Sequence, residues 1–262
     1  MTYNDNLEML NFEYLKNLNK EQKEAVSHID GPLLIVAGAG SGKTKVLTSR
    51  IAHIIKSKKA FPSQILSVTF TNKAAQEMQS RVSQILKKEA VGMGWLGTFH
   101  SVSAKILRKH ASAVGLTSNF SIIDQDDQIR LIKNICKSEN IDIKKLSPNY
   151  ILSIINFWKN KGLHPEKVIP SKKNVFEIGI LKIYKIYQAK LISLNACDFG
   201  DLILHCVTIF EKNNDILEIY ANNFKYILVD EYQDTNFIQS KWLNLLSEKN
   251  KNLCCVGDDD QS

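Results

Sequence analysis

The chain has 262 residues, a net charge of +7 and 44% apolar residues, enough for one large domain or two ordinary ones with packed cores. No apolar run approaches the ~20 residues of a membrane-spanning helix, and the N-terminus lacks the apolar segment of a signal peptide. The five cysteines form no C-x-x-C pair, so we expect neither a zinc site nor a disulfide framework, and we expect a cytoplasmic location. The positive charge fits an anionic partner such as nucleic acid rather than a membrane, although scattered lysines also fit a solvated basic surface.

A glycine-rich turn is the first informative feature along the chain. Asn19 is expected to cap a helix over 20–28, and a buried apolar strand follows at Leu33–Ala37. The strand leads into a turn with three glycines, and helical spacing of apolar residues then predicts a helix over Lys43–Lys56. This order of strand, turn and helix is typical of a P-loop, where backbone N–H groups and a helix N-terminus converge on phosphate oxygens.

The P-loop interpretation predicts ATP and Mg²⁺ as ligands. Lys43 is expected to reach the β- and γ-phosphates, and the Thr44 hydroxyl is expected to hold Mg²⁺. Ala37 stands where the pattern asks for glycine, a mild departure because alanine fits a strand end with negative φ. A glycine turn followed by a chance Lys-Thr pair is the alternative. The predicted nucleotide-binding residues of this turn are Ala37, Gly38, Ala39, Gly40, Ser41, Gly42, Lys43 and Thr44.

The later elements predict an α/β fold with a helical insertion. Strands are expected at Ile65–Phe70, from Trp95, at Tyr226–Val229 and at Leu253–Val256, and alternation with helices over 72–88 and 236–248 indicates a parallel sheet. Between Phe99 and about Tyr220 helical segments dominate. We therefore predict a P-loop core over 1–97 and 224–262 and a mostly helical inserted domain over 98–223. The helices expected in the insertion are 99–113, 124–138, 147–160, 174–193 and 199–212.

Two of these strands end in carboxylates. Asp230 is placed to hold Mg²⁺, and Glu231 to orient and deprotonate an attacking water. A strand that ends in Asp-Glu is by itself more often a surface cap, and the upstream P-loop is what favours the catalytic interpretation. Asp258–Asp260 and Gln261 follow the last strand. A solvated acidic turn is the default there, but at this sheet edge the Gln261 amide would sense the γ-phosphate, which makes it a third catalytic candidate after Lys43 and Glu231.

With these motifs in place, the chain closely resembles the N-terminal portion of a UvrD/Rep/PcrA-type superfamily 1 DNA helicase. Matches to the family's motifs follow in order along essentially the whole chain, and so many ordered matches do not arise by chance. A further segment, Asp198–Leu202, departs from the family, which usually has Asp where Gly200 stands; we expect this to weaken the role of that carboxylate and to fray the helix. The matching segments are Leu18–Gln22 (Q motif), Ala37–Thr44 (motif I), Thr69–Met78 (motif Ia), Gly97–Ser101 (motif Ib), Asp230–Asn236 (motif II) and Gly257–Ser262 (the opening of motif III).

The resemblance implies a RecA-like core, the family's 1A domain, with a helical 1B insertion. It also implies that Gln22 contacts adenine and that the protein binds single-stranded DNA or a junction of single- and double-stranded DNA. Phe70 would stack on an unpaired base, and polar neighbours would bind phosphates. The alternatives are a core phenylalanine, helix caps and a buried polar histidine. The residues expected to bind DNA are Phe70, Thr71, Asn72, Thr98 and His100.

In the family, a second RecA-like domain (2A) follows motif III and supplies arginines to the ATP site. We therefore expect this chain, without that domain in cis or in trans, to bind ATP–Mg²⁺ and some single-stranded DNA but to be nearly inactive as an ATPase and unable to unwind. The 3′→5′ polarity comes from the resemblance alone. The alternatives are the helicase part of a RecB/AddA-like helicase–nuclease, a non-enzymatic ATP- and DNA-binding remnant, and a small-molecule kinase with a P-loop.

Overall fold

The computed structural model describes residues 12–38, 40–144, 146–170 and 175–258. Contacts divide the chain into two compact units, which we call the core unit and the inserted unit. The sequence placed the ends of the insertion at 98 and 223, whereas the division falls at Ser103 and Ile216. The core unit is Met1–Val102, Leu217–Thr235 and Asn244–Ser262; the inserted unit is Ser103–Ile216 and Asn236–Leu243.

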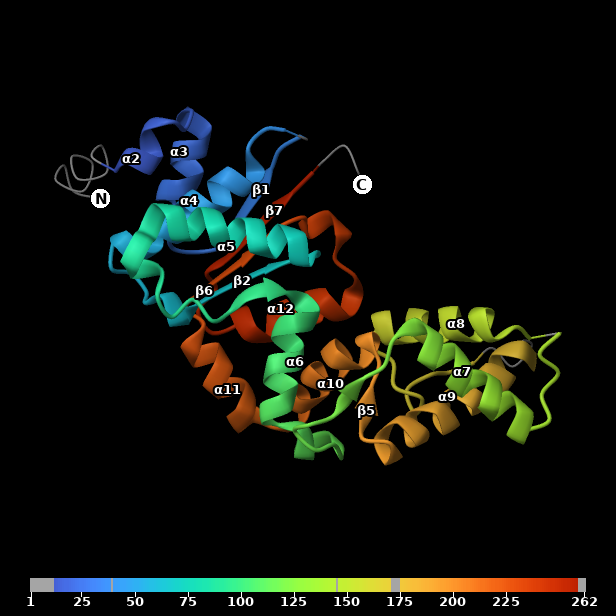
Figure 1. Cartoon of the computed structure of the whole chain (residues 1–262). Coiled ribbons are helices and arrows are strands. Elements are labelled where there is room, and N and C mark those ends of the chain that lie inside the picture. Colours follow the sequence, from blue (N-terminus) through green and yellow to red (C-terminus); the bar gives the residue numbers. More distant parts are fainter. Residues whose placement is uncertain (1–11, 39, 145, 171–174, 259–262) are drawn as a thin grey trace. The chain divides into compact units, whose positions relative to one another are not determined.

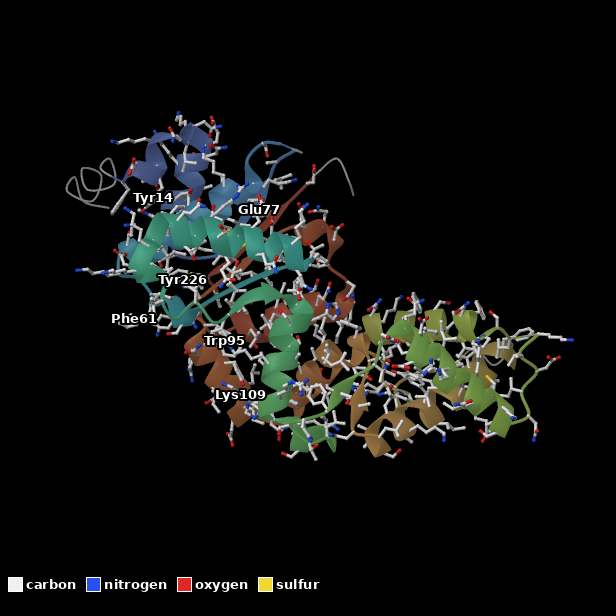
Figure 2. The ribbon with its side chains drawn as sticks, in the orientation of Figure 1. Tyr14, Phe61, Glu77, Trp95, Lys109 and Tyr226 are labelled. Carbon is white, nitrogen blue, oxygen red and sulfur yellow. The ribbon has the colours of Figure 1, made fainter. Side chains whose placement is uncertain are left out.

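Aromatic packing explains why the core unit extends further than the sequence predicted. The ring of Phe99 lies 5.5 Å from that of Phe70. At the other end, the Trp95 ring contacts Tyr220 and Phe224 edge-on, with ring centroids 5.9 and 5.2 Å apart; Trp95 is labelled in Figure 2. These contacts hold the start of the helix that begins at Phe99 and the end of the helix that contains Tyr220 against the core unit.

The described part of the core unit contains a five-stranded parallel sheet, which confirms the predicted fold class. Its strand order is β1-β7-β6-β2-β3, so β1, β7 and β6, which are distant in sequence, end side by side. The carboxyl ends of such strands are where α/β proteins bind ligands. The strands are β1 (Leu33–Val36), β2 (Ile65–Thr69), β3 (Leu96–Thr98), β6 (Tyr226–Val229) and β7 (Leu253–Gly257).

Strand β1 differs from the fully buried strand that the sequence predicted. Leu34 is 62% exposed and Val36 is 52% exposed. Among the described strands β1 pairs with β7 alone, so it forms an edge of this sheet with one face uncovered. The apolar run predicted the strand correctly, but a run of four apolar residues does not distinguish an edge strand from a central one.

Helices α4 and α5 cover one face of the sheet (Figure 1). Leu47 and Ile51 of α4 and Met78 of α5 pack there against Leu228 and Val256 of the central strands. The sequence predicted α4 with the bounds that the structure has. The helical elements that lie wholly in this unit are α2 (Glu13–Lys16), α3 (Lys20–Ser27), α4 (Lys43–Lys56), η1 (Pro62–Gln64), α5 (Asn72–Leu86), η2 (Lys87–Ala90) and η4 (Tyr232–Asp234). The chain division between the units falls within α11 (Asn214–Asn223) and α12 (Phe237–Ser247).

Helix α3 is fastened at both ends. At its N-terminus, Asn19 and Gln22 form a reciprocal capping box, as the sequence predicted for Asn19. At its C-terminus, the buried side chain of Arg50 in α4 donates to three carbonyls at and just beyond the helix end: Ala25 (2.7 Å), Ile29 (2.9 Å) and His28. Helix α3 is thereby tied to α4.

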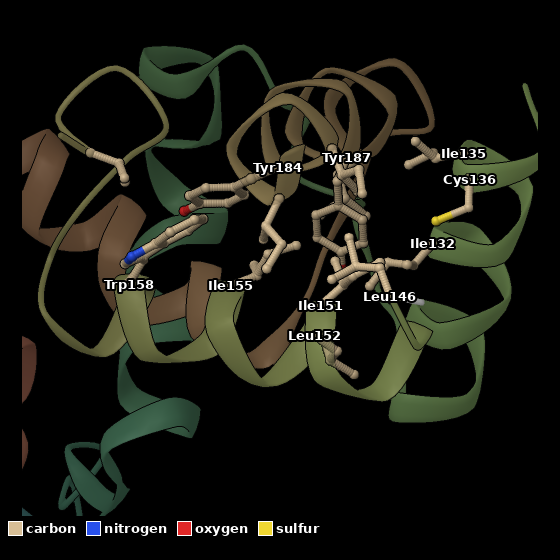
Figure 3. Packing of buried hydrophobic residues seen from close by; sticks show 14 of the residues in the cluster. Ile132, Ile135, Cys136, Leu146, Ile151, Leu152, Ile155, Trp158, Tyr184 and Tyr187 are labelled. Carbon is tan, nitrogen blue, oxygen red and sulfur yellow. The ribbon is translucent and has the colours of Figure 1, made fainter. Parts of the chain in front are cut away.

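The inserted unit is mostly helical, with its own apolar core between α7, α8 and α9. Figure 3 shows Ile132, Ile155 and Tyr184 in this core, and the Trp158 ring stacks on Tyr184 with centroids 5.8 Å apart. A short parallel strand pair, which the sequence did not predict, joins β4 to β5. The elements in order are α6 (Phe99–Lys109), η3 (Ala111–Val114), β4 (Ser121–Ile122), α7 (Gln125–Ser138), α8 (Pro148–Asn160), α9 (Val175–Ser193), β5 (Ala196–Cys197) and α10 (Phe199–Lys212).

The start of α10 contains a buried ion cluster. Lys159 of α8 donates to Asp198 (2.6 Å) and Asp201 (2.7 Å), and none of the three side chains is more than 1% exposed. The two aspartates also form the capping box of α10. The helix is ordered through Gly200, so the fraying predicted there was wrong. A Cβ at Gly200 would lie 2.9 Å from Lys159 Cδ, which means that the lysine stem fills the space a side chain would need.

Candidate functional site

The turn between β1 and α4 has the backbone shape that a P-loop requires. Gly40 and Gly42 have φ of +76° and +89°, values that favour glycine, and Gly42 is the N-cap of α4. A Cβ at Gly42 would also lie 3.0 Å from Gln22 Nε2. Ala37 donates its N–H to the Gly257 carbonyl at 3.1 Å, so it continues the strand as predicted. Ala39 lies outside the described residues.

Lys43, the first residue of α4, forms an ion pair that the sequence did not predict. Its Nζ lies 2.9 Å from Oδ2 of Asp258, and the two side chains are 9% and 2% exposed. Asp258 directly follows β7, the neighbour of β1 in the sheet. The alternative of a solvated acidic turn does not hold for Asp258, because its carboxylate is buried against Lys43. Asp259, Asp260 and the catalytic candidate Gln261 lie outside the described residues.

Asp230 and Glu231 lie at the carboxyl end of β6, next to β7. Burial and the negative charge of Glu231 raise the pKa of Asp230 to about 6, while the Glu231 N–H and the positive charge of Lys43 oppose that rise. Lys43 thus lies close enough to act electrostatically on the Asp230 carboxyl group. Lys43 and Asp230 are 187 positions apart in the sequence, which nevertheless predicted that they share one site. The structure brings the P-loop lysine and the carboxylate pair together.

Gln233 connects the ends of β6 and β7 through its side-chain amide. Its Nε2 donates to Glu231 Oε2 at 2.7 Å, and its Oε1 accepts the Asp258 N–H at 3.0 Å. This hydrogen bond from Gln233 helps to fix the Glu231 carboxylate. The Glu231 backbone is left-handed, with φ of +51°. Sequence reasoning missed Gln233; its position within the Asp230–Asn236 segment was the available signal.

The donor set at this edge suits a triphosphate and Mg²⁺. Thr44 offers a hydroxyl from the first turn of α4 and Asp230 a carboxylate, and both are the hard oxygen ligands that Mg²⁺ prefers. Gly40 and Gly42 turn the backbone toward the N-terminus of a 14-residue helix, where N–H groups lack intrahelical acceptors. The residues present therefore fit the two ligands that the sequence predicted.

Gln22 contacts the loop rather than standing free beside it. Its Nε2 donates to the Ser41 carbonyl at 2.9 Å, and its Oε1 accepts the Asn19 N–H at 3.1 Å within the capping box. Both ends of the amide are therefore used inside the protein. The predicted contact between Gln22 and adenine stays a prediction.

The residues expected to bind DNA lie at the ends of β2 and β3, which are adjacent strands. The hydroxyl of Thr71 caps α5 by accepting the Ala74 N–H at 3.1 Å, so its capping alternative is confirmed. The hydroxyl of Thr98 accepts the Ser101 N–H at 3.1 Å in the same way. The expected set of Phe70, Thr71, Asn72, Thr98 and His100 is thus brought to one sheet edge, with Phe70 and His100 partly buried and Asn72 exposed.

Burial lowers the pKa of His100, which keeps its imidazole neutral at physiological pH. A neutral ring binds a phosphate through one N–H donor and adds no charge.

No helix in the described part of the chain is both long and apolar enough to cross a membrane.

Comparisons with known proteins bear on the same features. The chain matches a model of the UvrD/REP helicase N-terminal domain over residues 18–262. It is 49% identical over 257 residues to a probable DNA helicase II homolog of Rickettsia conorii, and this alignment covers 97% of this chain and 39% of that protein. It is 48% identical over 248 residues to the ATP-dependent DNA helicase PcrA of Staphylococcus epidermidis, which covers 95% of this chain and 34% of that protein. The chain thus spans less than half the length of these relatives.

Proposed function

Because the chain belongs to the UvrD/REP helicase family, we propose that it is the ATP-binding half of an ATP-dependent 3′→5′ DNA helicase. The observation that carries the proposal is the shared edge of β1, β7 and β6, where Lys43, Asp258 and the Asp230–Glu231 pair meet. In this proposal the core unit corresponds to the family's 1A domain and the inserted unit to its 1B domain. A cytoplasmic location is part of the proposal, since that is where bacterial DNA lies.

Each residue at the edge has a role in ATP binding and hydrolysis. Lys43 exchanges its partner Asp258 for the β- and γ-phosphates, and the loop N–H groups bind the remaining phosphate oxygens. Thr44 and Asp230 hold Mg²⁺, which when bound neutralises charge on the phosphates. Glu231, oriented by Gln233, accepts a proton from the attacking water. Gln22 contacts adenine and Gln261 senses the γ-phosphate.

Single-stranded DNA, or its junction with a duplex, is the proposed partner at the ends of β2 and β3. Phe70 stacks on a base, which is worth about 1–3 kcal/mol by truncation, and Asn72, Thr98, His100 and the Thr71 turn contact phosphates. A second RecA-like domain, supplied in cis or in trans, contributes the arginines of the complete ATP site. An arginine of this kind is worth on the order of 10³–10⁵ in rate, so the chain alone is expected to be nearly inactive as an ATPase and unable to unwind.

Binding of a fluorescent ATP analogue to three variants tests this assignment. Lys43→Ala should weaken binding, because it removes the charge that faces the phosphates. Glu231→Gln should bind nucleotide like the unmodified chain and lose any residual hydrolysis. Lys45→Ala is the matched control, since the Lys45 ammonium donates to the Asn17 carbonyl at 2.6 Å, and the substitution should leave affinity unchanged.

Two results would contradict the proposal. Equal losses in Lys43→Ala and Lys45→Ala would mean that the loop does not grip phosphate. Fast, DNA-stimulated ATP hydrolysis by the unmodified chain would mean that no second domain is needed. The DNA part is tested separately: binding of an oligonucleotide should fall steeply with salt, since phosphate contacts release counterions, and should weaken in Phe70→Ala.

A further inference from the structure

Backbone hydrogen bonds hold Asp258 beside the phosphate loop. The register of β1 and β7 pairs Val36 with Gly257, and the Ala37 N–H donates to the Gly257 carbonyl at 3.1 Å. The Asp258 N–H in turn donates to Gln233 Oε1 at 3.0 Å. Because the backbone is fixed on both sides, a change of partner at the Asp258 carboxylate requires only rotation of that side chain.

The Asp258 carboxylate pairs with the ammonium group of Lys43. Oδ2 lies 2.9 Å from Nζ, and the side chains of Asp258 and Lys43 are 2% and 9% exposed, so little water screens the pair. The other two carboxylates of this edge have contacts of their own: Glu231 accepts from Gln233 Nε2 at 2.7 Å, and Asp230 accepts the Glu231 N–H at 3.2 Å. Among the described residues, Asp258 is thus the anion that Lys43 holds directly.

A phosphate group bound to the same ammonium would lie close to this carboxylate. Hydrogen bonds to one nitrogen have similar lengths and diverge at about the tetrahedral angle, so a phosphate oxygen on Lys43 would lie roughly 5 Å from Asp258 Oδ2. Like charges at that separation repel strongly where water is scarce. The carboxylate therefore opposes phosphate binding as long as it stays beside Nζ.

We propose that Asp258 competes with the nucleotide phosphates for Lys43, is displaced when they bind, and restricts the loop to ligands with more than one phosphate. This inference rests on the proposed ATP site and concerns the specificity of that site. A single small anion such as orthophosphate makes too few contacts to displace the carboxylate. A nucleoside di- or triphosphate also binds the loop N–H groups at the N-terminus of α4, where Gly42 is the N-cap, and these contacts offset the loss of the ion pair.

Calorimetric titration of Asp258→Asn with ADP, AMP and orthophosphate in EDTA tests the proposal. Asparagine keeps the shape of the side chain and loses its charge, so ADP should bind at least tenfold more tightly than it binds the unmodified chain. AMP lacks the β-phosphate that Lys43 is proposed to bind, so its affinity should not change. Orthophosphate should bind the variant measurably and the unmodified chain not at all.

Two further variants assign the effect to the ion pair. Glu24→Gln is the matched control, since it removes one negative charge from an exposed position of α3 and should leave ADP affinity unchanged. Lys43→Ala should weaken ADP binding. Adding Asp258→Asn to Lys43→Ala should recover less than twofold, because the carboxylate then has no ammonium to withhold, and such non-additivity identifies a direct interaction.

A measurement on the unmodified chain needs no variant and keeps the test open if Asp258→Asn does not fold. With ¹³C-labelled aspartate, the carboxyl resonance of Asp258 should move as ADP is added in EDTA, because the carboxylate loses its ammonium partner. AMP, which does not reach Lys43, should leave that resonance in place.

Three outcomes would overturn the proposal while leaving the ATP site standing. The first is an Asp258→Asn chain that binds ADP equally or more weakly while Lys43→Ala loses affinity. The second is an equal gain for AMP and ADP, which would reflect a general loss of negative charge. The third is an Asp258 carboxyl resonance that ADP does not move, which would mean that the ion pair persists in the complex. Unchanged ADP affinity in Lys43→Ala would instead contradict the proposed function itself, so the two failures are distinguishable.

Discussion

Asp230→Asn should make the isolated chain more stable while removing a proposed Mg²⁺ ligand. Asp230 is 4% exposed, and burial together with Glu231 raises its pKa from 3.8 to about 6. One pH unit corresponds to about 1.4 kcal/mol, so the ionised carboxylate costs the folded chain about 3 kcal/mol at pH 8. Asparagine is neutral and keeps an Oδ1 atom that accepts the Glu231 N–H, now 3.2 Å away.

The advantage of the variant should depend on pH. Because the folded-state pKa is raised, the folded chain binds more protons than the unfolded chain between pH 3.8 and about 6, and the unmodified protein loses stability as the pH rises through that window. Asparagine avoids the loss. We expect a gain of about 1.5 kcal/mol at pH 5 and about 3 kcal/mol at pH 8, which would raise the melting temperature by roughly 5–10 °C at pH 8.

Thermal unfolding in EDTA, followed by circular dichroism at both pH values, measures the effect. Asp258→Asn is the matched control, since this carboxylate lies at the same sheet edge but is paired with Lys43 at 2.9 Å. Its loss should lower the melting temperature, because it leaves the lysine buried without a partner. A destabilised Asp230→Asn chain, or a gain that does not change with pH, would refute the reasoning.

Three further predictions concern the inserted unit and the thiols. Gly200→Ala should lower the free energy of unfolding by about 1–3 kcal/mol, because its Cβ would lie 2.9 Å from Lys159 Cδ. Gly179→Ala, in an open position of α9, should raise the free energy of unfolding by about 0.5–1 kcal/mol. Equal melting temperatures of the two variants would contradict this. Lys159→Met should lower the free energy of unfolding, measured with urea, by about 3–5 kcal/mol, because Asp198 and Asp201 would remain buried without their cation. An unchanged urea midpoint would mean that the two carboxylates need no partner. All five cysteines are buried and free, so a thiol reagent should label the native chain far more slowly than the urea-unfolded chain; similar rates would show that the thiols are accessible.

The core elements were predictable because their patterns are local. The apolar runs at Ile65–Thr69 and Tyr226–Val229 and the helical spacing over Lys43–Lys56 each contain enough residues to identify the element. The sequence missed β4 and β5, which have two residues each and therefore no periodicity. These strands form because distant parts of the chain pair with each other, which local propensity does not encode.

The site shows the same division between local and long-range information. Lys43, Asp230 and Glu231 could be assigned because each directly follows a strand or turn that the sequence identifies. The pairing of Lys43 with Asp258 joins residues 215 positions apart, and the amide bridge of Gln233 depends on the adjacency of β6 and β7. Both are properties of strand order, so they emerged only from the structure.

The clamp that Arg50 places on α3 has a consequence for how the phosphate loop moves. Arg50 of α4 holds the carbonyls at the C-terminus of α3, and Gln22 donates to the Ser41 carbonyl. Helix α3 therefore cannot move independently of the loop while these bonds are kept. Any rearrangement at Ser41 must either break the Gln22 bond or carry the whole helix with it. The segment before β1 thus stiffens the phosphate loop, and trimming α3 would loosen a loop whose Ser41 lies 19 positions after Gln22 in the chain.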